Sequence, residues 1–210
     1  MDRAPISLPG RVVIFDYGDV VSARRSAADR DAIAALAGVR GEDEEKFWNS
    51  YYAHRDALDQ GTGARAYWRA IAGDIGADWD EARVHELWAA DFRSWATVNP
   101  GTIEVISDLA AGGTRLALLS NAGPDFGSFL RRGALGDYFE EVFVSGELGL
   151  IKPDPAIYIH ALAGLGIQAA DAVFTDNRAD NVLGAEALGF TGHVFTTPAA
   201  LRAFLTSLES

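Results

Sequence analysis

The sequence contains no cysteine and a single methionine among its 210 residues. Without cysteine the chain forms no disulfide bond and no zinc–thiolate site, and no thiol serves as a nucleophile. Basic residues are also scarce, because 18 Lys and Arg face 30 Asp and Glu and leave a formal net charge of -12. Binding to a nucleic-acid backbone needs clustered Lys and Arg, so we expect no nucleic-acid partner. A small anionic substrate stays compatible, since a metal ion and one Lys can balance its charge locally.

Long hydrophobic runs are missing as well. No stretch approaches the roughly 20 apolar residues of a membrane-spanning helix, so we expect no membrane partner. The one early apolar run, Val12 to Phe15, is too short for the core of a signal peptide, and a reduced, cytoplasmic setting is the prediction. With 49% hydrophobic residues, the chain can bury a sizeable core. The oligomeric state stays open.

Tryptophan is confined to one part of the chain. All five Trp residues fall between positions 48 and 95. Aromatic residues in this part recur at helical spacings, as Trp88 and Phe92 do. Helices are predicted over 27–36, 42–52, 64–71 and 80–92, with a turn at 59–63. This part is therefore predicted to be an inserted helical unit with its own aromatic core.

The rest of the chain alternates between short apolar runs and helical segments. Strands are predicted at 12–15, 115–119, 141–144, 172–175 and 192–195, and helices at 100–111, 125–133, 155–165 and 180–188. Such alternation requires parallel strands joined by right-handed crossovers. The predicted fold class is α/β, a doubly wound parallel sheet with an inserted all-α unit.

Four polar residues occur where the chain leaves these apolar runs. Asp16, Ser120 and Asp176 each follow a predicted strand directly, and Lys152 comes shortly after another. Ligands bind at the carboxyl ends of the strands in open α/β folds. The sequence therefore predicts a site that combines carboxylates, a hydroxyl and an ammonium group at one edge of the sheet.

The order of the segments around these residues resembles the haloacid dehalogenase (HAD) superfamily. Phe15-Asp16-Tyr17-Gly18-Asp19-Val20-Val21 resembles its motif I in the FDxGxV variant, and Leu118-Leu119-Ser120-Asn121 resembles motif II. Residues 152–158 resemble motif III, and residues 174–181 resemble motif IV. One such fragment is weak evidence, but four in the right order are strong evidence.

The resemblance covers nearly the whole chain. It implies a Rossmann-like α/β core at residues 1–22 and 96–210 and a helical cap of the subclass I type at residues 23–95. It is greatest to small capped phosphatases related to the sugar-phosphate phosphatases. We therefore expect magnesium-dependent hydrolysis of a small phosphomonoester, for example a sugar phosphate.

The chemistry assigns a role to each motif residue. Asp16 would attack phosphorus and form an aspartyl-phosphate, which splits hydrolysis into two easier displacements. Ser120 and the backbone amides of Asn121 and Ala122 would donate hydrogen bonds to the transferring oxygens, although a Ser after a strand is also a common turn or cap residue. Lys152 would neutralise both the nucleophile and the phosphoryl group.

A magnesium site is predicted beside the nucleophile. Asp176 and Asp180 offer the oxygen ligands that this hard cation prefers. By resemblance, Asp16 and the backbone carbonyl of Gly18 complete the protein ligands. For Asp180 three interpretations stay open, which are direct binding, binding through water, and capping of the following helix.

Position 18 departs from the usual family pattern. Most phosphatases of the superfamily carry a second Asp two residues after the nucleophile, where it protonates the leaving oxygen and then activates water. Gly18 offers no acid, and we expect it to need a backbone angle that glycine adopts easily. Asp19 is interpreted first as a turn residue and second as a substitute acid. Poor leaving groups should therefore turn over slowly.

The cap is expected to close over the site and to set substrate choice. Tyr52, His54 and Arg55 are the candidates there, although Tyr and His on a helix face more often pack than bind ligands.

Two alternative functions stay open. A 2-haloacid dehalogenase also uses an Asp nucleophile but needs no metal, and its motif I usually has Gly three residues after the nucleophile instead of two. A phosphate-binding pseudoenzyme would keep the pocket with little turnover. An assay of phosphate release with and without magnesium would distinguish a phosphatase from the dehalogenase and from the pseudoenzyme.

Overall fold

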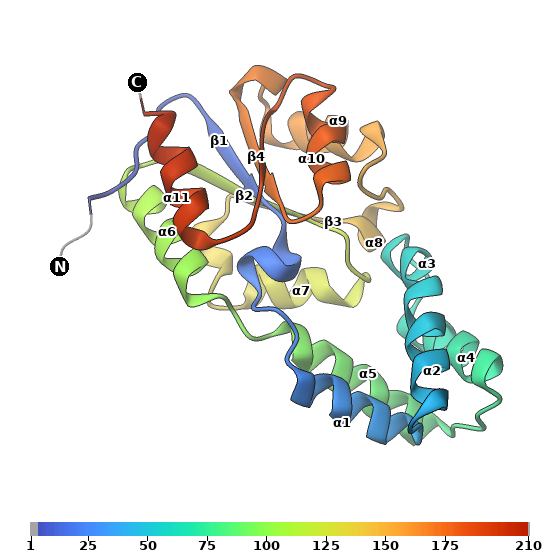
Figure 1. Cartoon of the computed structure of the whole chain (residues 1–210). Coiled ribbons are helices and arrows are strands. Elements are labelled where there is room, and N and C mark those ends of the chain that lie inside the picture. The colour runs from blue at the N-terminus through green and yellow to red at the C-terminus, as the bar shows by residue number, and fades with distance from the viewer. Residues whose placement is uncertain (1–3, 210) are drawn as a thin grey trace.

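The computed structural model describes residues 4–209, and its core is a five-stranded sheet with the order β3-β2-β1-β4-β5 (Figure 1). Every pairing in the sheet is parallel. The strands are β1 (Val12–Phe15), β2 (Arg115–Ser120), β3 (Glu141–Val144), β4 (Ala172–Asp176) and β5 (Thr191–Val194). This arrangement confirms the predicted doubly wound α/β fold. The strand order reverses between β1 and β4, which is where such sheets bind ligands.

Helices cover both faces of the sheet. Side chains of β1 alternate between the faces, so Val13 and Phe15 belong to one core and Val12 and Ile14 to another. The first core is closed by α6 (Pro100–Ala111), α7 (Asp125–Arg132) and α11 (Pro198–Ser207). The second is closed by α9 (Pro155–Leu165) and α10 (Ala179–Glu186). All four β1 residues are fully buried, as expected for a central strand covered on both sides.

The inserted unit is all-helical and lies to one side of the sheet (Figure 1). It consists of α1 (Ala27–Ala37), α2 (Glu42–Ala53), α3 (Arg55–Asp59), α4 (Ala64–Ile75) and α5 (Glu81–Trp95). A separate aromatic core holds these helices together, with Phe47, Tyr51 and Trp68 at its centre. This confirms the helical cap as part of the fold class.

Two adjacent linkers join the cap to the core. The backbone amide of Ala23 donates to the carbonyl of Thr97 at 2.7 Å, and that of Asn99 donates to the carbonyl of Val21 at 2.9 Å. Ser22 and Val98 form an antiparallel bridge between them. We propose this pair of linkers as the boundary between cap and core, at the predicted positions 22/23 and 95/96.

Three helices were not predicted: α3, α8 (Ser145–Leu148) and α11. The predicted turn at 59–63 follows α3 directly, and Gly61 within it has a φ of 107°. Short turns of helix also occur at η1 (Tyr17–Val21), η2 (Gly136–Tyr138) and η3 (Ala169–Asp171). None of the helices within residues 4–209 has the length and apolar character that crossing a membrane requires.

Candidate active site

The carboxyl ends of β1 and β4 meet at a buried ammonium group. Lys152 Nζ lies 2.7 Å from Asp16 Oδ1 and 2.7 Å from Asp176 Oδ2, and it also donates to the carbonyl of Leu119 at 2.8 Å. Asp16 is 7% exposed, Lys152 4% and Asp176 0%. The structure thus brings together three of the residues that the sequence placed in the site.

This cluster carries one more negative than positive charge. The pKa of Asp16 is raised to about 7, mainly because the carboxyl is buried. Lys152 acts to lower this pKa, and Asp176 acts to raise it further. Burial alone would lower the pKa of Lys152, but the two carboxylates outweigh it and the pKa is raised. The ammonium therefore stays protonated, and a further cation beside the carboxylates would be favourable.

The Asn121 side chain holds the backbone of Lys152 in place. Asn121 Oδ1 accepts from the Lys152 amide at 2.9 Å, and Asn121 Nδ2 donates to the Lys152 carbonyl at 3.0 Å. This amide fixes where the ammonium enters the site. Asp154 caps α9 by accepting from the Ala156 amide at 2.8 Å, as the sequence predicted.

Ser120 ends β2 and lines a cavity with Gly18 and Asn121. It is 2% exposed. The neighbouring Ala122 amide, predicted to donate to the phosphoryl oxygens, donates to Ser145 Oγ at 3.0 Å. That amide is therefore engaged within the protein in this structure.

Motif IV contributes Asn181 to the site instead of Asp180. Asp176 Oδ2 accepts from Asn181 Nδ2 at 2.9 Å, and Asp176 Oδ1 accepts from the Arg178 amide at 2.8 Å. Asp180 is exposed in the first turn of α10 and does not line the cavity. Successive residues of a helix point in different directions, so the inward position falls on Asn181. The structure therefore brings Asn181, and not Asp180, into contact with Asp176.

Gly18 has an ordinary backbone conformation, with φ -64° and ψ 123°. A Cβ atom built there would lie 3.8 Å from Asp16 Oδ2 and 3.8 Å from Trp95 Cζ3, without a clash. The expectation of a glycine-only angle is therefore wrong. The left-handed residue is Asp19, with φ 57°, a region that Asp visits more readily than most residues. Its amide donates to Ser22 Oγ at 3.0 Å, as a turn residue would.

Comparison with known proteins decides the family. A family model described as haloacid dehalogenase-like hydrolase matches residues 11–189. The chain is a HAD-like hydrolase. It is 31% identical over 169 residues to the phosphoserine phosphatase of Thermus thermophilus, and the aligned region covers 80% of this chain and 59% of that protein. It is 30% identical over 89 residues to the sesquiterpene phosphatase astK of Aspergillus oryzae, and the aligned region covers 42% of this chain and 45% of that protein. The chain thus spans about half the length of these curated relatives.

Solved HAD structures share the fold. A HAD family enzyme of Bacteroides thetaiotaomicron, in complex with magnesium and inorganic phosphate, has a TM-score of 0.68 at 19% identity. The superposed region covers 89% of this chain and 94% of that enzyme's chain. The L-2-haloacid dehalogenase of Xanthobacter autotrophicus also has a TM-score of 0.68, at 23% identity. The superposed region covers 94% of this chain and 82% of the dehalogenase chain. The fold alone therefore does not separate phosphatase from dehalogenase.

The oxygens at the active site of this HAD-like hydrolase suit a hard cation. Within residues 4–209 no three His, Asp or Glu side chains are grouped to hold a metal, and Asp16 and Asp176 are the two carboxylates that lie 2.7 Å from the Lys152 ammonium. Asn181 Oδ1 is buried and has no hydrogen-bond partner within the part of the chain that the structure describes. Two carboxylates, a free amide oxygen and a backbone carbonyl match the ligands of Mg²⁺, which keeps several waters.

The cap contributes two of its three predicted residues. A cavity of about 870 Å³, counting the space open to solvent, lies between cap and core and is lined by Asp16, Tyr52 and Arg55 among others. His54 does not line it, because its Nε2 lies 2.8 Å from Asp74 Oδ2 within the cap. Of the three cap candidates, His54 is the one that the structure does not place at this cavity.

Cap residues that the sequence analysis did not propose for the site also line this cavity, among them Trp95 and Asp59. Trp95, at the end of α5, has a buried Nε1 with no hydrogen-bond partner among the described residues. Asp59 is 6% exposed and pairs with Arg55, with 3.2 Å between Oδ1 and Nε. The confinement of tryptophan to the cap was the one available signal, but it did not indicate which Trp faces the nucleophile.

Proposed function

We propose that this chain hydrolyses a small phosphomonoester through an aspartyl-phosphate on Asp16, with magnesium as cofactor. The placement of Asp16 Oδ1 2.7 Å from Lys152 Nζ at the switch point of the sheet carries this proposal. Phosphatases among the relatives support it, since phosphoserine phosphatase and the sesquiterpene phosphatase act on phosphorylated molecules by their names.

The residues of the chain divide the reaction between them. Asp16 attacks phosphorus in line with the leaving oxygen, and the P–O bond to the leaving group breaks while the acyl phosphate forms. Lys152 and Ser120 interact with the transferring oxygens, and Asn121 keeps Lys152 in position. Water then attacks the acyl phosphate, which releases phosphate and regenerates the Asp16 carboxylate.

Asp16, Asp176, Asn181 and the carbonyl of Gly18 would hold the metal ion. When bound, it supplies positive charge that offsets repulsion between the nucleophile and the phosphoryl group. A dehalogenase would need no such ion, so the metal requirement is the observation that separates the two chemistries.

The test is phosphate release by wild type and Asp16→Asn, with magnesium and with excess chelator. We expect no release from Asp16→Asn, because an amide does not attack phosphorus, and none from wild type in chelator. Asp180→Asn makes the same chemical change on the exposed side of motif IV and serves as the matched control. Retained activity in a folded Asp16→Asn variant would remove the covalent mechanism. Halide release from a 2-haloacid in chelator would instead establish the dehalogenase.

A further inference from the structure

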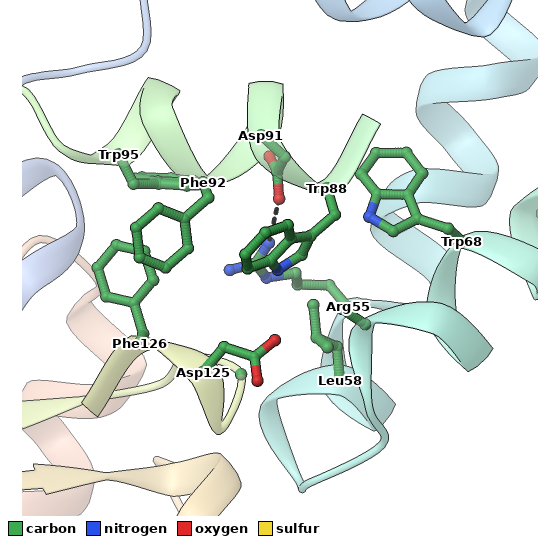
Figure 2. Close-up of a pocket in the computed structure, with 11 residues that line it drawn as sticks. Arg55, Leu58, Trp68, Trp88, Asp91, Phe92, Trp95, Asp125 and Phe126 are labelled. Atoms are coloured by element: carbon green, nitrogen blue, oxygen red, sulfur yellow. Dashed lines mark ion pairs between the residues drawn. The ribbon is translucent and has the colours of Figure 1, made fainter. Parts of the chain in front are cut away.

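A second cavity lies between the cap and the core, and five of the eleven residues that line it are aromatic (Figure 2). It encloses about 380 Å³, counting the space open to solvent. Figure 2 shows Trp88 and Phe92 of α5 and Phe126 of α7 around this space, with Leu58 of α3 on the opposite side. The cap and the core thus both contribute apolar walls.

This aromatic cavity adjoins the phosphate end of the active site. Trp95 and Arg55 line it, and they also line the cavity that contains Asp16. Phe126 is shared with the space beside Ser120 and Asn121. A group attached to a phosphate at Asp16 therefore has the aromatic cavity next to it.

Among the described residues that line the aromatic cavity, no unpaired cation is available to bind a negatively charged leaving group. Arg55 is the one cation among the described residues that line it, and this guanidinium already pairs with Asp59 at 3.2 Å and with Asp91 at 3.6 Å. Asp125 adds a carboxylate that points toward the space in Figure 2. A carboxylate or second phosphate on the leaving group would be repelled there.

We propose that the aromatic cavity binds the leaving group of the substrate, and that this group is uncharged and apolar, either an aromatic ring or a short branched hydrocarbon. The inference rests on the proposed phosphatase function and deepens it. Ring-lined walls favour apolar groups through burial and ring stacking.

Kinetic selectivity tests the proposal with substrates of matched leaving-group chemistry. Benzyl phosphate, 3-methylbutyl phosphate and ethyl phosphate all release primary alcohols, and phosphoglycolate adds a carboxylate. We expect kcat/KM for the benzyl and methylbutyl esters to exceed that for ethyl phosphate by about 10–200-fold, the range for added apolar groups in a hydrophobic pocket. Phosphoglycolate should be the poorest substrate. Equal values across the esters, or a preference for phosphoglycolate, would overturn the proposal.

Variants of Trp88 assign the selectivity to the cavity. Trp88→Ala should lower the benzyl-to-ethyl ratio of kcat/KM by about tenfold or more, and Trp88→Phe should restore most of it. His85→Ala is the matched control, because His85 is exposed and contacts Trp88 from outside the cavity. A ratio unchanged in Trp88→Ala, with the melting temperature maintained, would contradict the assignment.

Binding separates this inference from the proposed function. Calorimetry with benzylphosphonate and ethylphosphonate, which are not hydrolysed, measures the apolar preference without turnover. If no ester is hydrolysed but benzylphosphonate binds more tightly in wild type than in Trp88→Ala, the phosphatase function fails and the apolar site stands. If esters are hydrolysed without preference and both phosphonates bind equally, the apolar site fails and the phosphatase stands.

Discussion

Replacement of Lys152 by Met should strongly destabilise the fold. Methionine keeps most of the length of the side chain and removes the ammonium group. The change leaves Asp16 and Asp176, which are 7% and 0% exposed, without the cation that lies 2.7 Å from each. The carbonyl of Leu119 loses its donor as well.

Removal of one partner from a buried ion pair costs about 3–5 kcal/mol. For a chain of this size each kcal/mol corresponds to roughly 2–4 °C in melting temperature. We therefore expect Lys152→Met to melt about 6–20 °C below wild type. Adding Asp16→Asn should recover part of the loss, because one of the two uncompensated carboxylates is then neutral.

Urea denaturation followed by circular dichroism, in the presence of a chelator, measures these free energies directly. Arg24→Met, the matched control, removes a cation from the cap linker outside the cluster. Magnesium should then stabilise Lys152→Met by binding to the two carboxylates that have lost their cation, by about 2.7 kcal/mol at a concentration of 100 Kd. A loss below about 1 kcal/mol, or a double variant less stable than Lys152→Met, would refute this account of the cluster.

Two further predictions concern motif IV and position 18. Asn181→Ala should lower phosphate release about 10–100-fold, because Asp176 loses a positioning partner. Asp180→Ala should stay near wild type, and the reverse ranking would restore Asp180 to the site. Gly18→Asp should raise hydrolysis of ethyl phosphate by up to about 10²-fold by adding a general acid, with little effect on p-nitrophenyl phosphate. An unchanged ethyl-to-aryl ratio in the folded variant would show that the acid comes from elsewhere.

The strands of the core were predictable because buried parallel strands form continuous apolar runs. The predictions at 12–15 and 141–144 coincide with β1 and β3, and the others differ by one residue. Helices α3 and α8 have five and four residues, too few to show a helical period. The longer α11 had a usable signal, since Thr197 caps it and Pro198 opens it.

The core end of the site was predictable for the same reason, because each motif residue follows a strand whose position was known. Helix faces were harder to assign. Asp180 and Asn181 are neighbours in sequence, and only the packing of α10 decides which of them meets Asp176. In the cap, His54 contacts Asp74, while the next residue, Arg55, lines the cavity that contains Asp16.

If the proposed function holds, we expect substrate choice to come largely from the cap, because the polar groups of the core are already engaged with one another. Lys152 Nζ has three partners in the protein, and the Asn121 side chain is used at both of its polar atoms. The Ala122 amide is held by Ser145. These groups can position a phosphoryl group, which is the same in every phosphomonoester, but they do not reach beyond it. We therefore expect the parts of a substrate that differ to lie against α3, α5 and the start of α7, where five of the eleven lining residues are aromatic and the one cation among the described lining residues is already paired.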